Sequence, residues 1–129
     1  MNSTNPLISV VTVSYNAADT IEQTILSVIN QNFTDYEYII VDGGSTDSTL
    51  DIIKKYQDKI TLWVSEPDRG IYDAMNKGIR FAKGEWINFM NAGDSFSDEE
   101  TLGASVQSIA KQPNIEVLYS DVNRFLDGK

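Results

Sequence analysis

The sequence predicts an α/β fold in which a parallel sheet carries helices on both faces. Apolar runs rich in β-branched and aromatic residues alternate four times with segments of helical spacing, and short polar turns separate them. This alternation is typical of Rossmann-like sheets, whose strands are joined by right-handed helical crossovers. The 129 residues include 41% hydrophobic and 22% charged side chains, and no glycine-, proline- or serine-rich linker divides them. We therefore expect a single domain with one core.

Five segments have the pattern of buried strands. Their apolar residues are continuous or alternate with a period of two. The segments are Leu7–Tyr15, Tyr36–Val41, Ile60–Val64, Trp86–Met90 and Ile115–Tyr119. Trp86 and Met90 are expected in the core. Because no helical segment follows the fifth strand, we expect the sheet to be incomplete and the chain to be the front part of a larger unit.

Two helices are predicted between the first three strands. Asp19 is followed three residues later by Glu22, the spacing of a capping box. The apolar residues of this first helix recur on one face, at Ile21, Ile25 and Val28. The second helix begins in the Ser45–Ser48 cluster, any residue of which could cap it. It directs Leu50 and Ile53 inward.

Two further helices follow the third and fourth strands. One extends from about Gly70 to Lys83, and Gly84 is expected to end it. Its apolar face comprises Ile71, Ala74, Met75, Gly78, Ile79 and Ala82. The other helix begins at a second capping-box pattern, Ser97 with Glu100, and ends before Pro113.

The charge balance and two missing residue types exclude several functions. Ten Lys and Arg against nineteen Asp and Glu give a formal charge of -9, which would repel nucleic acid and anionic lipid. The absence of Cys and His excludes disulfides, thiolate nucleophiles, histidine bases and structural zinc sites. The longest apolar run, Leu7–Val13, is far shorter than the roughly 20 residues of a membrane span. We expect a cytoplasmic protein without an integral membrane segment; peripheral association through parts outside residues 1–129 stays open.

Polar residues follow three of the predicted strands where each one ends. These turns are Tyr15-Asn16, Asp42–Ser45 and Asn91–Asp94, and in a parallel sheet they converge at one edge. Each turn alone is typical of ordinary loop chemistry. Their occurrence together with the polar segment Glu66–Gly78 favours a binding site at this edge.

Four motifs make the prediction more specific. They are Val10–Asn16, Val41–Asp47, Asn76–Gly78 and the apolar strand that leads into Asn91–Asp94. In this order and spacing they resemble family 2 glycosyltransferases of the GT-A fold, and the resemblance covers the chain from Leu7 to about Phe96. The segment Ser65–Gly78 is similar to the subgroup that builds bacterial exopolysaccharides such as colanic acid.

The resemblance implies an inverting sugar transfer from a nucleotide-diphospho-sugar donor to a glycan or lipid-linked acceptor, in bacterial surface polysaccharide biosynthesis. It also implies a divalent cation, Mg²⁺ or Mn²⁺, that bridges the diphosphate and is held by Asp94. A hard cation between the phosphates stabilises the charge of the leaving nucleoside diphosphate without moving a proton. Oxygen ligands, often one or two carboxylates, suit both metals.

The resemblance also assigns roles to the other candidate residues. The backbone at Val13 and the ring of Tyr15 would contact the nucleobase, and Asp42 would line the nucleoside pocket. Arg69 would hold phosphate oxygens through its guanidinium. Asn76 would fix its loop or contact the donor sugar, and Asn91 would lie beside the nucleotide-sugar. A solvated Arg69 and an Asn76 that bonds only a neighbouring loop are equally compatible with the residues themselves.

Three departures from the family pattern qualify these roles. Gly43 stands where the family usually has a second acid, which changes the expected contact with the base. Asn91 and Gly93 stand where the metal motif usually has acids, so Asp94 is the single carboxylate, and a more water-coordinated metal site is expected. The catalytic base is expected beyond residue 129. Residues 1–129 are therefore predicted to form the nucleotide-sugar-binding part of a GT-A domain, without the acceptor half.

Two other functional classes share this fold class. In a receiver-like, non-catalytic domain, Asp42 and neighbouring acids would hold magnesium, but the fifth predicted strand has no lysine after it. A dinucleotide-dependent oxidoreductase needs a glycine-rich turn after the first strand, and Tyr15–Asp19 contains no glycine.

Overall fold

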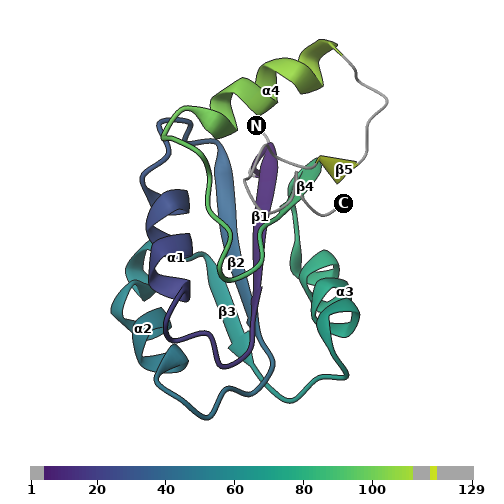
Figure 1. Cartoon of the computed structure of the whole chain (residues 1–129). Coiled ribbons are helices and arrows are strands. Elements are labelled where there is room, and N and C mark those ends of the chain that lie inside the picture. Colours follow the sequence, from purple (N-terminus) through teal and green to yellow (C-terminus); the bar gives the residue numbers. More distant parts are fainter. Residues whose placement is uncertain (1–4, 112–116, 119–129) are drawn as a thin grey trace.

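A single parallel sheet forms the centre of the protein (Figure 1). The computed structural model describes residues 5–111 and 117–118. The sheet order is β3-β2-β1-β4-β5, and every pair of neighbours is parallel. The strands are β1 (Ile8–Ser14), β2 (Tyr36–Asp42), β3 (Leu62–Ser65), β4 (Trp86–Phe89) and β5 (Val117–Leu118). The predicted α/β class is confirmed, and each strand lies within or close to its predicted segment.

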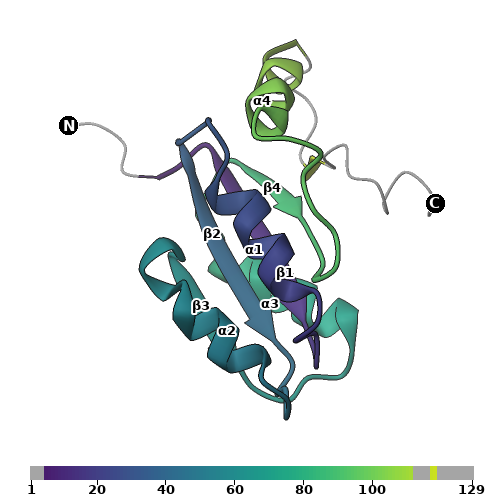
Figure 2. The same ribbon diagram turned by 60° about the vertical axis from the view of Figure 1, so that its left-hand side comes forward.

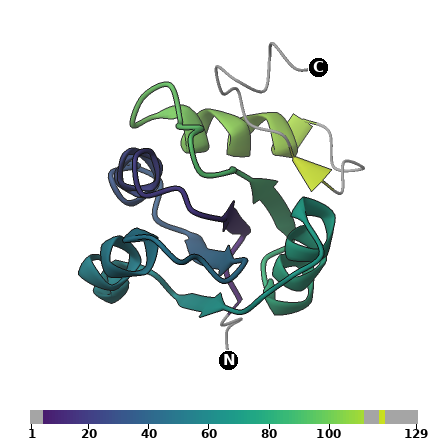
Figure 3. The same ribbon diagram turned by 60° about the horizontal axis from the view of Figure 1, so that its bottom comes forward.

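The helices cover both faces of the sheet, as predicted. They are α1 (Ile21–Ile29), α2 (Thr49–Lys55), α3 (Ile71–Phe81) and α4 (Thr101–Lys111), with a 3₁₀ turn, η1 (Gln57–Lys59), after α2. Figure 3, viewed along the strands, shows α1 and α2 on one side of the sheet and α3 on the other. In Figure 2, α1 crosses in front of the central strands. Within the described residues no helix is both long and apolar enough to span a bilayer.

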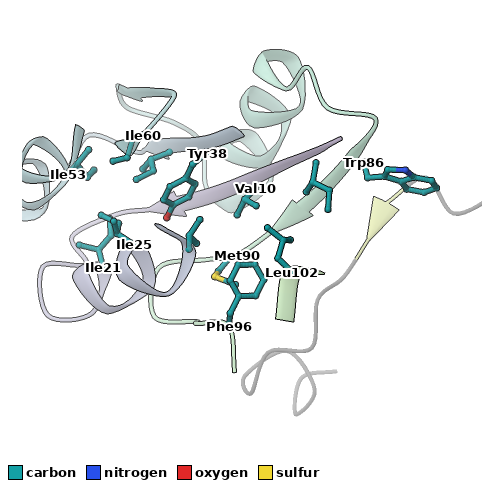
Figure 4. Packing of buried hydrophobic residues seen from close by; sticks show 13 residues of the cluster. Val10, Ile21, Ile25, Tyr38, Ile53, Ile60, Trp86, Met90, Phe96 and Leu102 are labelled. Atoms are coloured by element: carbon teal, nitrogen blue, oxygen red, sulfur yellow. The ribbon is translucent and has the colours of Figure 1, made fainter. Parts of the chain in front are cut away.

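The larger core lies between the sheet and the helices α1, α2 and α4. Figure 4 shows Met90, Phe96 and Leu102 close to one another near Val10, with Tyr38 toward α1. All five side chains are buried. Trp86 belongs to the same cluster, so the prediction that Trp86 and Met90 are core residues is confirmed. Packing of these helices on one face fixes where the loops that leave β1, β2 and β4 begin.

The smaller core lies beneath α3, which approaches β1 closely. A Cβ atom on Gly78 would lie 2.5 Å from Val11 Cγ1, so only glycine permits this spacing. Ala74 and Gly78 face the sheet, but Ile71 and Ile79 are 45% and 47% exposed. The predicted apolar face of this helix is therefore wrong at both isoleucines, because the small side chains make the contact and leave the large ones at its margins.

The helix ends differ from the predicted capping boxes. Thr20, without a side-chain cap bond, precedes α1, and Glu22 instead accepts hydrogen bonds from Lys55 Nζ, at 2.8 Å, and from the Tyr56 hydroxyl. Before α4, Asp98 Oδ1 accepts the Glu100 N–H at 2.8 Å, in place of the predicted Ser97 and Glu100 pair. Tertiary contacts between α1 and α2 outweigh the local cap because Glu22 is within reach of a cation and a hydroxyl.

Gly84 does not end α3, which already stops at Phe81. Its role is close packing against β1: an added Cβ would lie 2.7 Å from both the backbone nitrogen and the Oγ of Ser9. The prediction for Gly84 was wrong because periodicity along α3 carries no signal of a contact with a distant strand.

Asn88, on β4, is a buried polar side chain whose amide atoms have no hydrogen-bond partner within the described part of the chain. It is 0% exposed. A buried, unpaired polar group costs about 1–3 kcal/mol. We expect Asn88→Leu, which has a similar shape, to raise the free energy of unfolding by about 1–3 kcal/mol in urea denaturation. Asn88→Asp should change the free energy of unfolding in the opposite direction, because it places a charge at the same buried position. A stability of Asn88→Leu equal to or lower than that of the unaltered chain would contradict the expectation.

Candidate functional site

A cavity of about 730 Å³ lies at the carboxyl edge of the sheet. The residues that line it come from the end of β1 and from the segments that follow β1, β2, β3 and β4. Its size is that of a small-molecule site. In open α/β sheets ligands bind at this edge. The lining residues are Val13, Ser14, Tyr15, Ala17, Gly43, Gly44, Pro67, Asp68, Gly70, Ile71, Ala74, Asn91 and Ala92.

The loops after β1 and β2 are joined by side-chain to backbone hydrogen bonds. Asn16, with a positive φ of 47°, donates its N–H to Ser45 Oγ at 2.8 Å, and its Oδ1 accepts the Thr46 N–H at 2.8 Å. The Ala17 N–H donates to Thr49 Oγ1 at 2.9 Å. These bonds satisfy backbone groups where the strands end and hold the two loops in fixed relative positions.

Asp42 organises the loop after β2. Its Oδ1 accepts the hydroxyls of Ser14 (2.7 Å) and Ser45 (2.6 Å), and its Oδ2 accepts the Ser65 hydroxyl (2.9 Å) and the N–H groups of Gly44 (3.0 Å) and Ser45 (2.7 Å). The side chain is 0% exposed. Burial raises its pKa, but the hydrogen bonds from Ser45, Ser14 and Ser65 outweigh this effect, and the pKa lies below its usual value.

Asp42 therefore lies beneath the loop and is not among the residues that line the cavity. The register pairs it with Ser14 of β1 and Ser65 of β3, so a single carboxylate fixes three neighbouring strand ends. A direct contact of Asp42 with a nucleoside stays a prediction. Its five internal bonds argue against the receiver-like alternative, in which this carboxylate would hold magnesium.

Three predicted site residues meet in the cavity. Val13, Tyr15 and Asn91 all line it. The Tyr15 ring is 62% exposed, which leaves a face for stacking on a ligand. Arg69 and Asn76 are exposed and do not line the cavity; the backbone N–H of Arg69 donates to Asp73 Oδ2 at 3.0 Å. The contacts predicted for Arg69 and Asn76 stay predictions.

Asp94 is buried and comes two residues after Ala92, which lines the cavity. Its turn is fixed to α1 by Thr24, whose hydroxyl donates to the Asp94 carbonyl oxygen at 2.6 Å and accepts the Gly93 N–H at 2.9 Å. Gly93 has a φ of 104°, a conformation that favours glycine. Ala92 lines the cavity, whereas Asp94 does not.

The arrangement of the acidic residues limits how a metal could be held. Within the described ranges, no three carboxylates are grouped to form a metal cage. Mg²⁺ and similar cations are often held by one or two carboxylates with substrate phosphates and waters completing the shell. The role of Asp94 as such a ligand stays a prediction: Asp94 is buried and does not line the cavity, whereas Asn91 does.

Lys77 and Asp68 belong to the site region and were assigned no role from sequence. Lys77 is nearly buried, and its Nζ lies 2.9 Å from Glu66 Oε2, 4.0 Å from Asp73 Oδ2 and 3.4 Å from the Pro67 carbonyl oxygen. It holds the segment before α3 against the helix. The spacing of Asp73 and Lys77, four residues apart, is the signal that could have indicated their pairing. Asp68 lines the cavity, which only the folded loop reveals.

The fold is that of an α/β protein, and its cavity lies at the carboxyl edge of the sheet, where open α/β sheets bind their ligands. Residues 9–124 match the model of glycosyl transferase family 2, and the chain belongs to this family.

The chain is similar to two curated glycosyltransferases. It is 38% identical over 103 residues to the putative teichuronic acid biosynthesis glycosyltransferase TuaG of Bacillus subtilis, covering 78% of this chain and 41% of TuaG. It is 33% identical over 120 residues to a PGL/p-HBAD biosynthesis glycosyltransferase of Mycobacterium bovis, covering 91% of this chain and 47% of the relative. The chain thus spans less than half the length of these relatives.

Two solved structures share the fold. Staphylococcus aureus TarS 1-349 in complex with UDP-GlcNAc has a TM-score of 0.76 at 29% identity, covering 82% of this chain and 32% of that one. The mannosyltransferase PcManGT from Pyrobaculum calidifontis, in complex with GDP-Man and Mn²⁺, has a TM-score of 0.75 at 27% identity, covering 84% and 33%. These similarities confirm the GT-A fold and the resemblance on which it was predicted.

Proposed function

We propose that the cavity binds the nucleotide-diphospho-sugar donor of an inverting glycosyltransferase. The enzyme would transfer the sugar to a glycan or lipid-linked acceptor in bacterial surface polysaccharide biosynthesis, in the cytoplasm. The observation that carries the proposal is the cavity itself, a space of about 730 Å³ at the carboxyl edge whose wall includes Val13, Tyr15 and Asn91. TarS with UDP-GlcNAc and PcManGT with GDP-Man support a donor of this class.

The acceptor site and the catalytic base belong, in this proposal, to the protein beyond residue 129. The relatives are more than twice as long as the part of them that the chain matches. An inverting transfer needs a carboxylate within hydrogen-bond reach of the acceptor hydroxyl. The described residues that line the cavity supply one carboxylate, Asp68. In this proposal, the part of the described residues in the reaction is to hold and orient the donor.

The charges of the cavity support a divalent cation as cofactor. Of the described residues, those that line the cavity include no lysine or arginine. A diphosphate in this place therefore needs a cation, and Mg²⁺ or Mn²⁺ would neutralise its charge and that of the leaving nucleoside diphosphate. Asp94 would hold the cation from the loop after β4, and the first turn of α3 would direct N–H groups toward the phosphates. Bound Mn²⁺ in PcManGT supports a metal of this kind.

Calorimetric titration of UDP and GDP, with and without Mn²⁺, tests the proposal. We expect one of the two to bind in the presence of Mn²⁺ and to bind at least about tenfold more weakly without it. Asp94→Asn should lose the metal-dependent gain but keep the metal-free affinity, because only the cation's ligand is altered. Asp51→Asn, an exposed acid on α2, is the control for loss of one negative charge.

Two results would count against these assignments separately. Binding that is indifferent to both Mn²⁺ and Asp94 would contradict the metal role while leaving the donor site in place. Absence of binding by every nucleoside diphosphate would contradict the donor site.

A further inference from the structure

Polar side chains at one side of α1 hold the loop that connects β4 to α4, and the two segments run side by side (Figure 1). Thr24 contacts the beginning of this loop. Ser27 Oγ accepts the Phe96 N–H at 3.2 Å, and Gln31, just after the helix, donates from Nε2 to the Asp98 carbonyl oxygen at 2.6 Å. The three side chains are three and four residues apart, the spacing of neighbours on one side of a helix. The loop therefore takes its position from a helix that does not line the cavity.

Thr24 makes the contacts of this set that lie nearest to the cavity. Its side chain is 0% exposed. The hydroxyl donates to the Asp94 carbonyl oxygen at 2.6 Å and accepts the Gly93 N–H at 2.9 Å. A hydroxyl has one hydrogen and two lone pairs, so this single atom satisfies a donor and an acceptor of the same turn. Valine has a similar shape and can make neither bond.

The turn that Thr24 holds also forms one wall of the cavity. Asn91 and Ala92 line the cavity, and the Ala92 N–H donates to the Val13 carbonyl oxygen of β1 at 2.9 Å. The turn is thus attached to β1 at its beginning and to Thr24 of α1 at its end. Gly93 lies between these two attachments, and glycine restricts the backbone less than any other residue. The Thr24 hydroxyl is therefore the restraint on the end of the turn that comes from α1.

We propose that Thr24 is a positioning residue of the donor site, whose hydroxyl holds the turn from Asn91 to Asp94 in the conformation that binds the donor. This assignment rests on the proposed function, which places the donor against Asn91. Thr24 does not line the cavity, so it acts through the backbone of Gly93 and Asp94. Groups that bind a ligand must be held to within about 0.5 Å of the productive geometry. Loss of the Thr24 hydroxyl should therefore weaken donor binding without removing any group that contacts the donor.

The test is calorimetric titration of UDP, GDP, CDP and ADP, all with Mn²⁺, against the full chain and its variants. In Thr24→Val, affinity for the nucleotide that binds the unaltered chain should fall about tenfold or more, the range for residues that orient a binding group. Thr24→Ser keeps the hydroxyl and should retain the affinity, although loss of a buried methyl group lowers its stability in urea denaturation. Affinity then follows the hydroxyl alone, which a merely structural role of the side chain would not produce.

Ser27→Ala is the matched control for Thr24→Val. It removes a hydrogen bond from α1 to the same loop at Phe96, which does not line the cavity. Nucleotide affinity should be unchanged. Amide hydrogen exchange gives a second measurement: the Gly93 N–H should exchange faster in Thr24→Val, and the Phe96 N–H should exchange faster in Ser27→Ala.

Gly93→Ala alters the turn from its own side and leaves Thr24 intact. The φ of 104° disfavours any side chain, although no atom lies nearer than 3.7 Å to an added Cβ. The backbone of the turn must therefore shift, and affinity should fall as it does in Thr24→Val. The double variant should bind no more weakly than the weaker single variant, because both substitutions act on one turn. Circular dichroism establishes that each variant is folded.

The remaining outcomes separate this assignment from the proposed function. Retained affinity in Thr24→Val or Gly93→Ala, or an equal loss in Thr24→Ser or Ser27→Ala, would overturn the role of Thr24 and leave the proposed function in place. If Thr24→Val does not fold, Gly93→Ala decides: a loss of affinity supports the assignment and retention overturns it. If none of the four nucleotides binds the unaltered chain, the proposed function fails, and this assignment fails with it.

Discussion

Replacing Asp42 by asparagine is expected to lower the free energy of unfolding by about 3 kcal/mol, the cost of breaking a buried, hydrogen-bonded charge. The substitution keeps the shape but directs an amide N–H group at hydroxyl and N–H donors. Five hydrogen bonds converge on this carboxylate from Ser14, Gly44, Ser45 and Ser65. For a domain of this size the change corresponds to a fall in melting temperature of about 10 °C. Urea denaturation and thermal melting measure both quantities.

The effect of Asp42 should depend on pH in a defined direction. Because its pKa is lowered in the folded protein, the stabilisation is fully present above the pKa of the unfolded chain and is lost as pH falls through the lower, folded pKa. The stability difference between the wild type and Asp42→Asn should therefore be constant near neutral pH and shrink below about pH 4. Asp51→Asn, exposed on α2, should show no comparable difference. A difference that is independent of pH would contradict this account.

Gly84→Ala is expected to destabilise the protein by about 3 kcal/mol, at the upper end for overpacking, because its methyl group meets backbone that cannot move. The added Cβ would lie 2.7 Å from the Ser9 nitrogen and 2.8 Å from the Ile8 carbonyl carbon, both in the central strand β1. The Gly84 N–H also donates to Ser9 Oγ at 2.8 Å, and Ser9 Oγ donates to the buried Glu37 carboxylate. Displacing β1 would break this chain of bonds.

Gly103→Ala is the matched control for Gly84→Ala. Gly103 lies in α4, where the nearest atom to an added Cβ is 3.8 Å away, on Phe33. Alanine should leave stability unchanged or raise it by up to about 1 kcal/mol through helix propensity. Guanidinium denaturation of both variants measures the difference. Equal stability of the two variants would show that β1 yields to the added methyl group.

Much of the candidate site could be predicted from the sequence because its loops follow strands with clear periodicity. Tyr15 and Asn91 each come directly after an apolar run or close to its end, and a parallel sheet brings such positions to one edge. The positions of Asp42 and Asp68 could not be predicted in this way. Whether a carboxylate turns inward to its own loop or outward to the cavity depends on donors from other strands, such as Ser14 and Ser65 around Asp42.

The sequence by itself determined the α/β class, the order of strands and helices, the absence of histidine and cysteine chemistry and the resemblance to glycosyltransferases. These follow from periodicity, composition and local motifs, which depend on residues near one another in the chain. Only the tertiary structure decided that Asp42 supports the loop from beneath, that Asp68 occupies the space beside Gly43 and that Gly84 packs on Ser9. Each is a contact between segments that are distant in the sequence, and close packing sets such contacts only when the register of strands and the approach of helices are known.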